Sequence, residues 1–133
     1  LMEAIKIVIL ISLFFLITYI IFYFVIDEII IFFFDEAYHN VTPFIKIYII
    51  ASLFLGLTGI LGFPLLGLLI NANIVKKIIL FSGTLNLLSL FLWIFFLPQS
   101  IFNIVVIHLI INIFIFLLQG LIILMNLNKV NFS

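Results

Sequence analysis

The sequence predicts an all-α integral membrane protein with four transmembrane helices and both termini on the cytoplasmic or matrix side. Apolar residues make up 68% of the chain and charged residues only 8%, whereas charged residues are about a quarter of a typical soluble protein. The apolar residues form four stretches, each longer than the ~20 residues that a helix needs to cross a bilayer. The lysines gather at alternate breaks between the stretches, a pattern that indicates orientation.

The polar breaks delimit the predicted elements. Spans are expected at 4–26, 43–70, 74–97 and 101–126, with an acidic and apolar outer loop at 27–42. Each span is expected to be helical because hydrocarbon offers no partner for open backbone groups. The chain leaves no room beside the spans for a soluble domain of ~100 residues. Residues 1–133 are therefore expected to form a single transmembrane domain.

The first span is apolar throughout and has no small-residue cleavage site, so it does not resemble a removable signal peptide. The loop after it begins "DEIIIFFFDEAYH". If this segment is helical, its four acids cover one half of the circumference, while Ile30, Phe33 and Phe34 lie on the other half. Helices that lie on lipid usually carry Lys or Arg on the polar face, and this segment carries acids. The apolar half is therefore expected to be a partner-docking edge.

The same loop contains a metal-like pattern. Glu36 and His39 have the Glu-x-x-His spacing, and Asp35 lies four residues before His39, so all three can share a helical face. Di-iron bundles need this motif twice, with two further glutamates, and the chain has it once. A solvated acidic turn is the preferred interpretation, with Asp35, Glu36 and His39 as candidate ligands in the alternative.

The second span is rich in small residues. Ser52, Gly56, Gly59 and Gly62 predict a close-packing face, because small side chains let helices approach each other in lipid. Pro64 is expected to kink this helix or to end its straight part.

The third and fourth spans carry polar stripes. Helical spacing places Ser82, Asn86 and Ser89 on one stripe, together with Trp93, and His108, Asn112 and Gln119 on another. Polar side chains avoid lipid, so the stripes are expected to face each other, with hydrogen bonds between helices that specify register. The alternatives are a conduction or binding path and contact with a partner subunit.

Four lysines indicate the orientation. Lys6, Lys76, Lys77 and Lys129 fall on one side of a four-span topology, and the acids of the 27–42 loop fall on the other. The positive-inside rule then places both termini in the cytoplasm or matrix. The expected location is a bacterial or archaeal cytoplasmic membrane or the mitochondrial inner membrane. Lys46 is the exception, and its stem is expected to reach outward to the nearby acids.

Several functions are excluded by what the sequence lacks. Without cysteine there is no disulfide, iron–sulfur cluster or Cys-ligated zinc within this chain. There is no basic patch for nucleic acid and no phosphate-binding or nucleophile motif. A haem held by this chain alone on His108 would need a second ligand at similar depth, but the other histidine, His39, is in the loop, so a haem on His108 would have to be shared with another subunit. No cofactor and no enzyme activity are expected.

Two functions remain. The first is a non-catalytic hydrophobic subunit of a larger membrane complex, such as a respiratory or other energy-converting complex, which scaffolds neighbouring subunits. The alternative is a small homo-oligomeric channel or transporter with a polar path along the third and fourth spans.

Overall fold

The computed structural model describes residues 2–96 and 100–130 of the chain. Within these residues, four helices are long and apolar enough to cross a membrane, at Ile5–Phe34, Glu36–Leu69, Ala72–Phe95 and Ile101–Leu127. This confirms the prediction of an all-α chain with four helices that can each span a membrane. Position 97, where the third span is predicted to end, lies outside the described residues.

The elements follow one another with short connections. In chain order they are α1 (Met2–Phe34), the 3-10 helix η1 (Glu36–Val41), α2 (Thr42–Ile60), the π-helix η2 (Leu61–Leu66), α3 (Gly67–Leu69), α4 (Ala72–Phe96) and α5 (Ile101–Val130). The second span therefore combines α2, η2 and α3.

Helix α1 continues beyond the predicted end of the first span. Positions 27–34 contain neither glycine nor proline, and the helix persists to Phe34. It ends at Asp35, whose φ of 76° lies in the left-handed region that interrupts a helix. The Asp35 carboxylate accepts a hydrogen bond from the backbone N–H of Glu36 at 2.6 Å, which starts η1. The predicted 27–42 loop is thus corrected to helical structure on both sides of Asp35.

The second span widens where proline interrupts it. Pro64 has no N–H to donate, and its ring crowds the carbonyl four residues earlier. The structure accommodates this as a π-helix at Leu61–Leu66, which is a known way to take up a local mismatch within an α-helix. After Ile70, in extended conformation, the Asn71 side chain accepts the N–H of Asn73 at 2.8 Å. This bond caps the start of α4.

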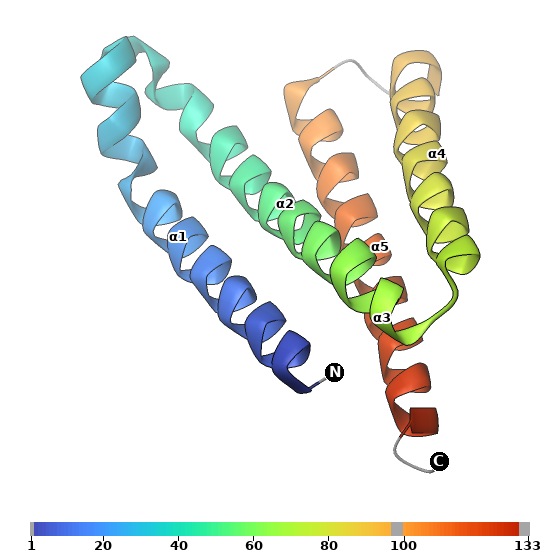
Figure 1. The fold of residues 1–133 in the computed structure, drawn as a ribbon. Helices are drawn as coiled ribbons and strands as arrows, with labels where there is room; N and C mark the ends of the chain where they lie inside the picture. Colours follow the sequence, from blue (N-terminus) through green and yellow to red (C-terminus); the bar gives the residue numbers. More distant parts are fainter. Residues whose placement is uncertain (1, 97–99, 131–133) are drawn as a thin grey trace.

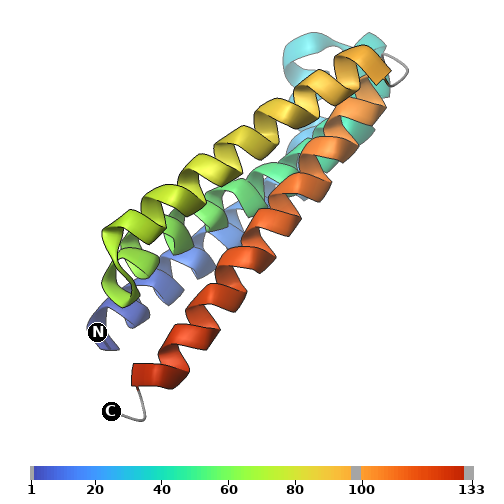
Figure 2. The same ribbon diagram turned by 90° about the vertical axis from the view of Figure 1, so that its right-hand side faces the viewer.

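The helices form an open row in the order α1, α2, α5, α4 (Figure 1). Helix α2 makes the most extensive contacts, with α5 on one side and α1 on the other, while α4 packs mainly against α5. Figure 2 shows α4 and α5 in front of α1 and α2. Both chain ends lie at the same end of the molecule along the helix axes. Because a single span, α4, separates them along the chain, α2 and α5 run parallel. Most of the surface of the edge helices α1 and α4 is not covered by other helices of the chain.

The hydrophobic core lies at the end of the molecule where the two termini are. Val8 of α1, Leu65 and Leu66 of η2, Val75 of α4 and Ile123 of α5 pack together there. Toward the opposite end, α4 diverges from α2 (Figure 1). All four spans therefore meet at the end with the termini, whereas α2 and α4 separate toward the other end.

Candidate functional site

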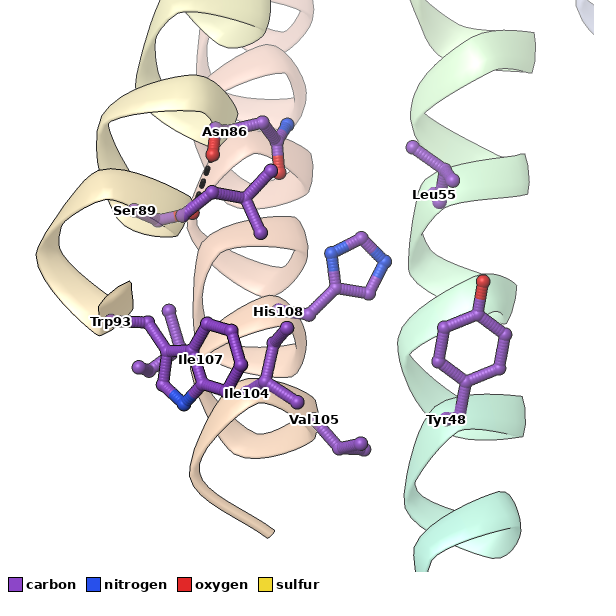
Figure 3. A pocket seen from close by; sticks show the side chains of 10 residues that line it. Tyr48, Leu55, Asn86, Ser89, Trp93, Ile104, Val105, Ile107 and His108 are labelled. Carbon is purple, nitrogen blue, oxygen red and sulfur yellow. Dashed lines mark hydrogen bonds between the residues drawn. The ribbon is translucent and has the colours of Figure 1, made fainter. Parts of the chain in front are cut away.

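A groove lies between α2 and α4, where these helices diverge, with α5 between them, and we call it the polar groove (Figure 3). Its volume is about 410 Å³, and it is lined by Tyr48, Leu55, Asn86, Ser89, Leu90, Trp93, Ile104, Val105, Ile107 and His108. Most of the lining is apolar, with a few polar groups from three different helices. This composition is typical of a binding site rather than of tightly packed interior.

The imidazole of His108 lies at the centre of the polar groove. It stacks on the phenol ring of Tyr48, with ring centroids 5.7 Å apart and planes inclined by 15°. The two residues come from α5 and α2, and Figure 3 shows the rings side by side between those helices. Tyr48 was not identified from the sequence. Its only sequence signal is its depth, since both residues lie within about two turns of the same end of their helices.

The serine and asparagine side chains of the polar stripe on α4 form hydrogen bonds within their own helix. Ser82 Oγ donates to the Ile78 carbonyl at 2.9 Å, Asn86 Nδ2 donates to the Ser82 carbonyl at 3.1 Å, and Ser89 Oγ donates to the Asn86 carbonyl at 2.6 Å. These bonds stay within one helix, so they do not join the two predicted stripes. The expectation that these α4 residues bond to another helix is corrected. A hydroxyl or amide can bond the carbonyl one turn back without leaving its own helix.

The α5 stripe divides between two neighbours. His108 faces the polar groove, but Asn112 and Gln119 are 1% and 2% exposed, on the side of α5 that packs against α2. A Cβ built on Gly62 would lie 3.4 Å from Gln119 Nε2, which places Gln119 directly against the second span. The two stripes therefore meet only at the groove, because α5 buries its deeper polar residues against α2 instead of α4.

Some buried polar atoms in this region have no hydrogen-bond partner. They include both amide atoms of Asn112, Oε1 of Gln119, Oγ1 of Thr58 and Nε1 of Trp93. Thr58 lies one turn before Gly62, on the same face of α2. Its hydroxyl differs from those of Thr18 and Thr84, which bond the carbonyl four residues earlier. These unpartnered atoms belong to α5 and to the two helices that contact it, α2 and α4.

The predicted close-packing residues separate into two groups. A Cβ on Gly56 would lie 2.9 Å from Phe15 Cε1, so α1 packs tightly at this position. Gly62 makes the corresponding close approach to α5. A Cβ on Gly59 would meet nothing within 4 Å, and Gly59 is exposed. Gly59 is therefore removed from the close-packing set, because it points away from both neighbouring helices. Ser52 is half-buried in the interface between α1 and α2.

The predicted docking edge is reduced to two residues. Phe33 and Phe34 are 69% and 57% exposed, whereas Ile30 is 7% exposed and is covered by the chain itself. This corrects the predicted set, because Ile30 lies on the side of α1 that packs against the rest of the chain. Phe33 and Phe34 stay available for a neighbour.

The metal candidates are not assembled into a site. Among residues 2–96 and 100–130, no group of three or more His, Asp and Glu side chains lies close enough to hold a metal ion. Asp35 uses a carboxylate oxygen to bond the backbone of Glu36. His39 lines a cavity that also contains Asp27 and Lys46. As predicted, Lys46 reaches the outer acids, since its Nζ donates to the Asp27 carboxylate.

No protein-family model matches this chain, and no curated protein or solved structure shows significant similarity to it.

Proposed function

We propose that this chain is a non-catalytic hydrophobic subunit of a larger membrane protein complex, in which it scaffolds neighbouring subunits. An energy-converting complex such as a respiratory complex is the kind of assembly that fits such a subunit. The polar groove has a mostly apolar lining into which a few hydrogen-bonding side chains and one imidazole project. Such groups suit contact with a neighbouring protein.

The observation that carries the proposal is the open polar groove beside α4. Of the described α4 side chains, those of Val75 and Ser89 are buried, and most of the large apolar ones are exposed. Lipid can cover the apolar surface of α4, but it offers no hydrogen-bond partner to the imidazole of His108 or to the indole N–H of Trp93, which line the groove. Polar groups at membrane depth normally face protein or a hydrated cavity. A transmembrane helix from a neighbouring subunit would cover both kinds of surface.

The same proposal includes an orientation and a location. Lys6 lies near the start of α1, and Lys76 and Lys77 lie near the start of α4, at the end where the termini are. The acids from Asp27 to Glu36 lie toward the other end. The positive-inside rule supports placing the termini in the cytoplasm or matrix. The membrane would then be a bacterial or archaeal cytoplasmic membrane or the mitochondrial inner membrane.

The test is co-purification in mild detergent, followed by sizing and mass spectrometry. The native chain is expected to elute with a reproducible set of unrelated membrane subunits. Leu90→Trp, which places a large ring at the groove, is expected to release them, because a neighbouring helix could no longer approach. Leu10→Trp is the matched control, since Leu10 is 69% exposed on α1 and does not line the groove. A clean homodimer without other subunits would contradict the proposal.

A second candidate is a small homo-oligomeric channel or transporter. It is favoured by one observation, the convergence of Asn86 and Ser89 from α4 with His108 from α5 on one cavity. In this case Asn86→Leu and His108→Leu, which change two polar side chains lining the cavity, would abolish flux in proteoliposomes while leaving the oligomer intact. Unchanged flux in both variants would eliminate the polar residues as a path.

A further inference from the structure

A second cavity lies at the end of the molecule opposite the termini, between α1, η1 and the start of α2. Its volume is about 590 Å³, and its polar lining includes Asp27, His39, Thr42 and Lys46, with Tyr23 beside them. We call it the headgroup cavity. The cavity therefore offers one cation, one anion, an imidazole and an aromatic ring at the edge of a membrane-spanning pair of helices.

The charged pair in this cavity keeps unused bonding capacity. Lys46 Nζ bonds one oxygen of Asp27 and lies 5.4 Å from the centroid of the Tyr23 ring. The side chains of Lys46 and Asp27 remain 28% and 32% exposed. An ammonium group has three donors and a carboxylate has two oxygens, so each can bind a further group of opposite charge. The pair can therefore hold a ligand that carries both a negative and a positive group.

Thr42 gives an independent indication of a ligand. It lines the headgroup cavity and is 2% exposed, yet its hydroxyl oxygen has no hydrogen-bond partner. Thr18 and Thr84, which are less buried, both bond a carbonyl of their own helix. A buried hydroxyl without a partner is costly unless a bound polar group satisfies it.

An apolar groove continues from the cavity along the interface between α1 and α2. It has a volume of about 230 Å³ and is lined by Tyr19, Ile20, Tyr23, Ile49, Ile50 and Leu53. Tyr23 and Ile50 line both spaces, so the two are contiguous. The lining changes from charged to apolar along the helix axes, away from the end of the molecule. A lipid with its headgroup at the membrane surface has the same distribution.

We propose that the headgroup cavity and this groove bind one phospholipid with a primary ammonium headgroup, of the phosphatidylethanolamine class. Lys46 and His39 bind the phosphate, Asp27 accepts from the ammonium, and an acyl chain lies against Tyr19, Ile49 and Ile50. A primary ammonium has N–H donors for the Asp27 carboxylate, whereas a quaternary ammonium has none. An anionic lipid without an amine would leave Asp27 facing negative charge. This site is independent of the proposed subunit role and is tested on the purified chain.

The test is native mass spectrometry of the delipidated full-length chain, titrated with three probes. These are phosphatidylethanolamine, phosphatidylglycerol and phosphoethanolamine without acyl chains. Phosphatidylethanolamine is expected to bind about tenfold more tightly than phosphatidylglycerol, which is the effect of losing one charge-assisted bond. It is also expected to bind more tightly than phosphoethanolamine, which has no acyl chain to bury in the groove. Equal binding of the two lipids would overturn the headgroup assignment, and equal binding of phosphoethanolamine would overturn the role of the groove.

Variants locate the site. The double variant Asp27→Asn, Lys46→Met removes the pair without leaving an unpaired charge, and it is expected to abolish the preference for phosphatidylethanolamine. Its control is Glu3→Gln, Lys6→Met, which removes the exposed pair at the opposite end of α1. Ile50→Trp fills the junction of the two spaces and keeps the test valid should the double variant fold poorly, with Leu10→Trp as its exposed control. Unchanged lipid preference in Ile50→Trp would overturn the proposed site.

Discussion

Polar side chains on the membrane-spanning helices differ in whether they have a hydrogen-bond partner. Those on α4 bond the carbonyls of their own helix, as Asn86 and Ser89 do, and Asn126 of α5 does the same through the Ile122 carbonyl at 2.8 Å. Asn112 and Gln119 instead direct atoms into the contact between α5 and α2, where these atoms have no partner. An amide that is buried without partners costs more than one that bonds its own backbone. Two asparagines in the same helix can therefore affect the stability of the fold differently.

Replacing Asn112 tests this difference. Asn112→Leu is expected to raise the free energy of unfolding by about 1–3 kcal/mol, because it removes an unpaired amide and keeps a side chain of similar size. The measurement is thermal or denaturant unfolding in detergent, monitored by circular dichroism. Asn126→Leu is the control, and it should give no gain because the Asn126 amide is already bonded. A loss of stability in Asn112→Leu would show that Asn112 has a polar partner in the membrane.

The second span shows how one helix can serve two neighbours. Gly56 allows α1 to approach, Gly62 allows α5 to approach, and Gly59 between them faces neither. Gly62 lies within the π-helix at Leu61–Leu66, which offsets the last turns of the span from the first. Leu65 and Leu66 of this π-helix enter the core. The irregular segment is thus part of the most tightly packed region of the molecule.

Two glycine substitutions distinguish the faces of this helix. Gly56→Leu is expected to lower the free energy of unfolding by about 1–3 kcal/mol, because its side chain would overlap the Phe15 ring in a packed interface. Gly59→Leu is the matched control, and it should be neutral or slightly stabilising since its side chain meets open space. Unfolding in detergent measures both. Equal losses in the two variants would contradict the assignment of faces.

The molecule as a whole is an open row, with α1 and α4 at its edges. A closed four-helix bundle would bury one stripe of every helix, but here α2 and α5 form the centre and the edge helices expose most of their large apolar side chains. Lipid covers such surface at little cost, because hydrocarbon and leucine are similarly apolar. The polar groove and the phenylalanines at the end of α1 are the features that favour a protein neighbour.

The end of α1 provides a test at this level. Replacing both Phe33 and Phe34 by Ser is expected to reduce co-purification of neighbouring subunits while leaving the unfolding of the isolated chain nearly unchanged, because both rings are exposed. Ile30→Ser should have the opposite effect and destabilise the chain itself, since Ile30 is 7% exposed. Co-purification and unfolding are measured on the same preparations. Intact assembly in the double variant would remove Phe33 and Phe34 from the interface.

Much of the architecture follows from the sequence because hydrocarbon imposes a strict rule. Every backbone group must be bonded within its own segment, so long apolar stretches such as 4–26 and 101–126 have to be helical. The pairing of Lys46 with the outer acids is likewise predictable, because a long basic side chain near a helix end has few other partners. The small residues of the second span indicate close packing, but they do not indicate which neighbour each one meets.

The partners of each helix were decided by the tertiary structure. Helical spacing places Asn112, Gln119 and His108 on one stripe, yet it contains no information on whether α2 or α4 faces that stripe. Helical spacing likewise places Ile30, Phe33 and Phe34 on one half of a helix, but only the packed structure shows that Ile30 is buried while Phe33 and Phe34 are exposed. Because all four helices are apolar on every side, hydrophobicity alone cannot rank the possible pairings. The pairing is selected by close contacts at a few small residues, such as Gly56 against Phe15 and Gly62 against Gln119. Which side chain meets which glycine is known only from the packed structure.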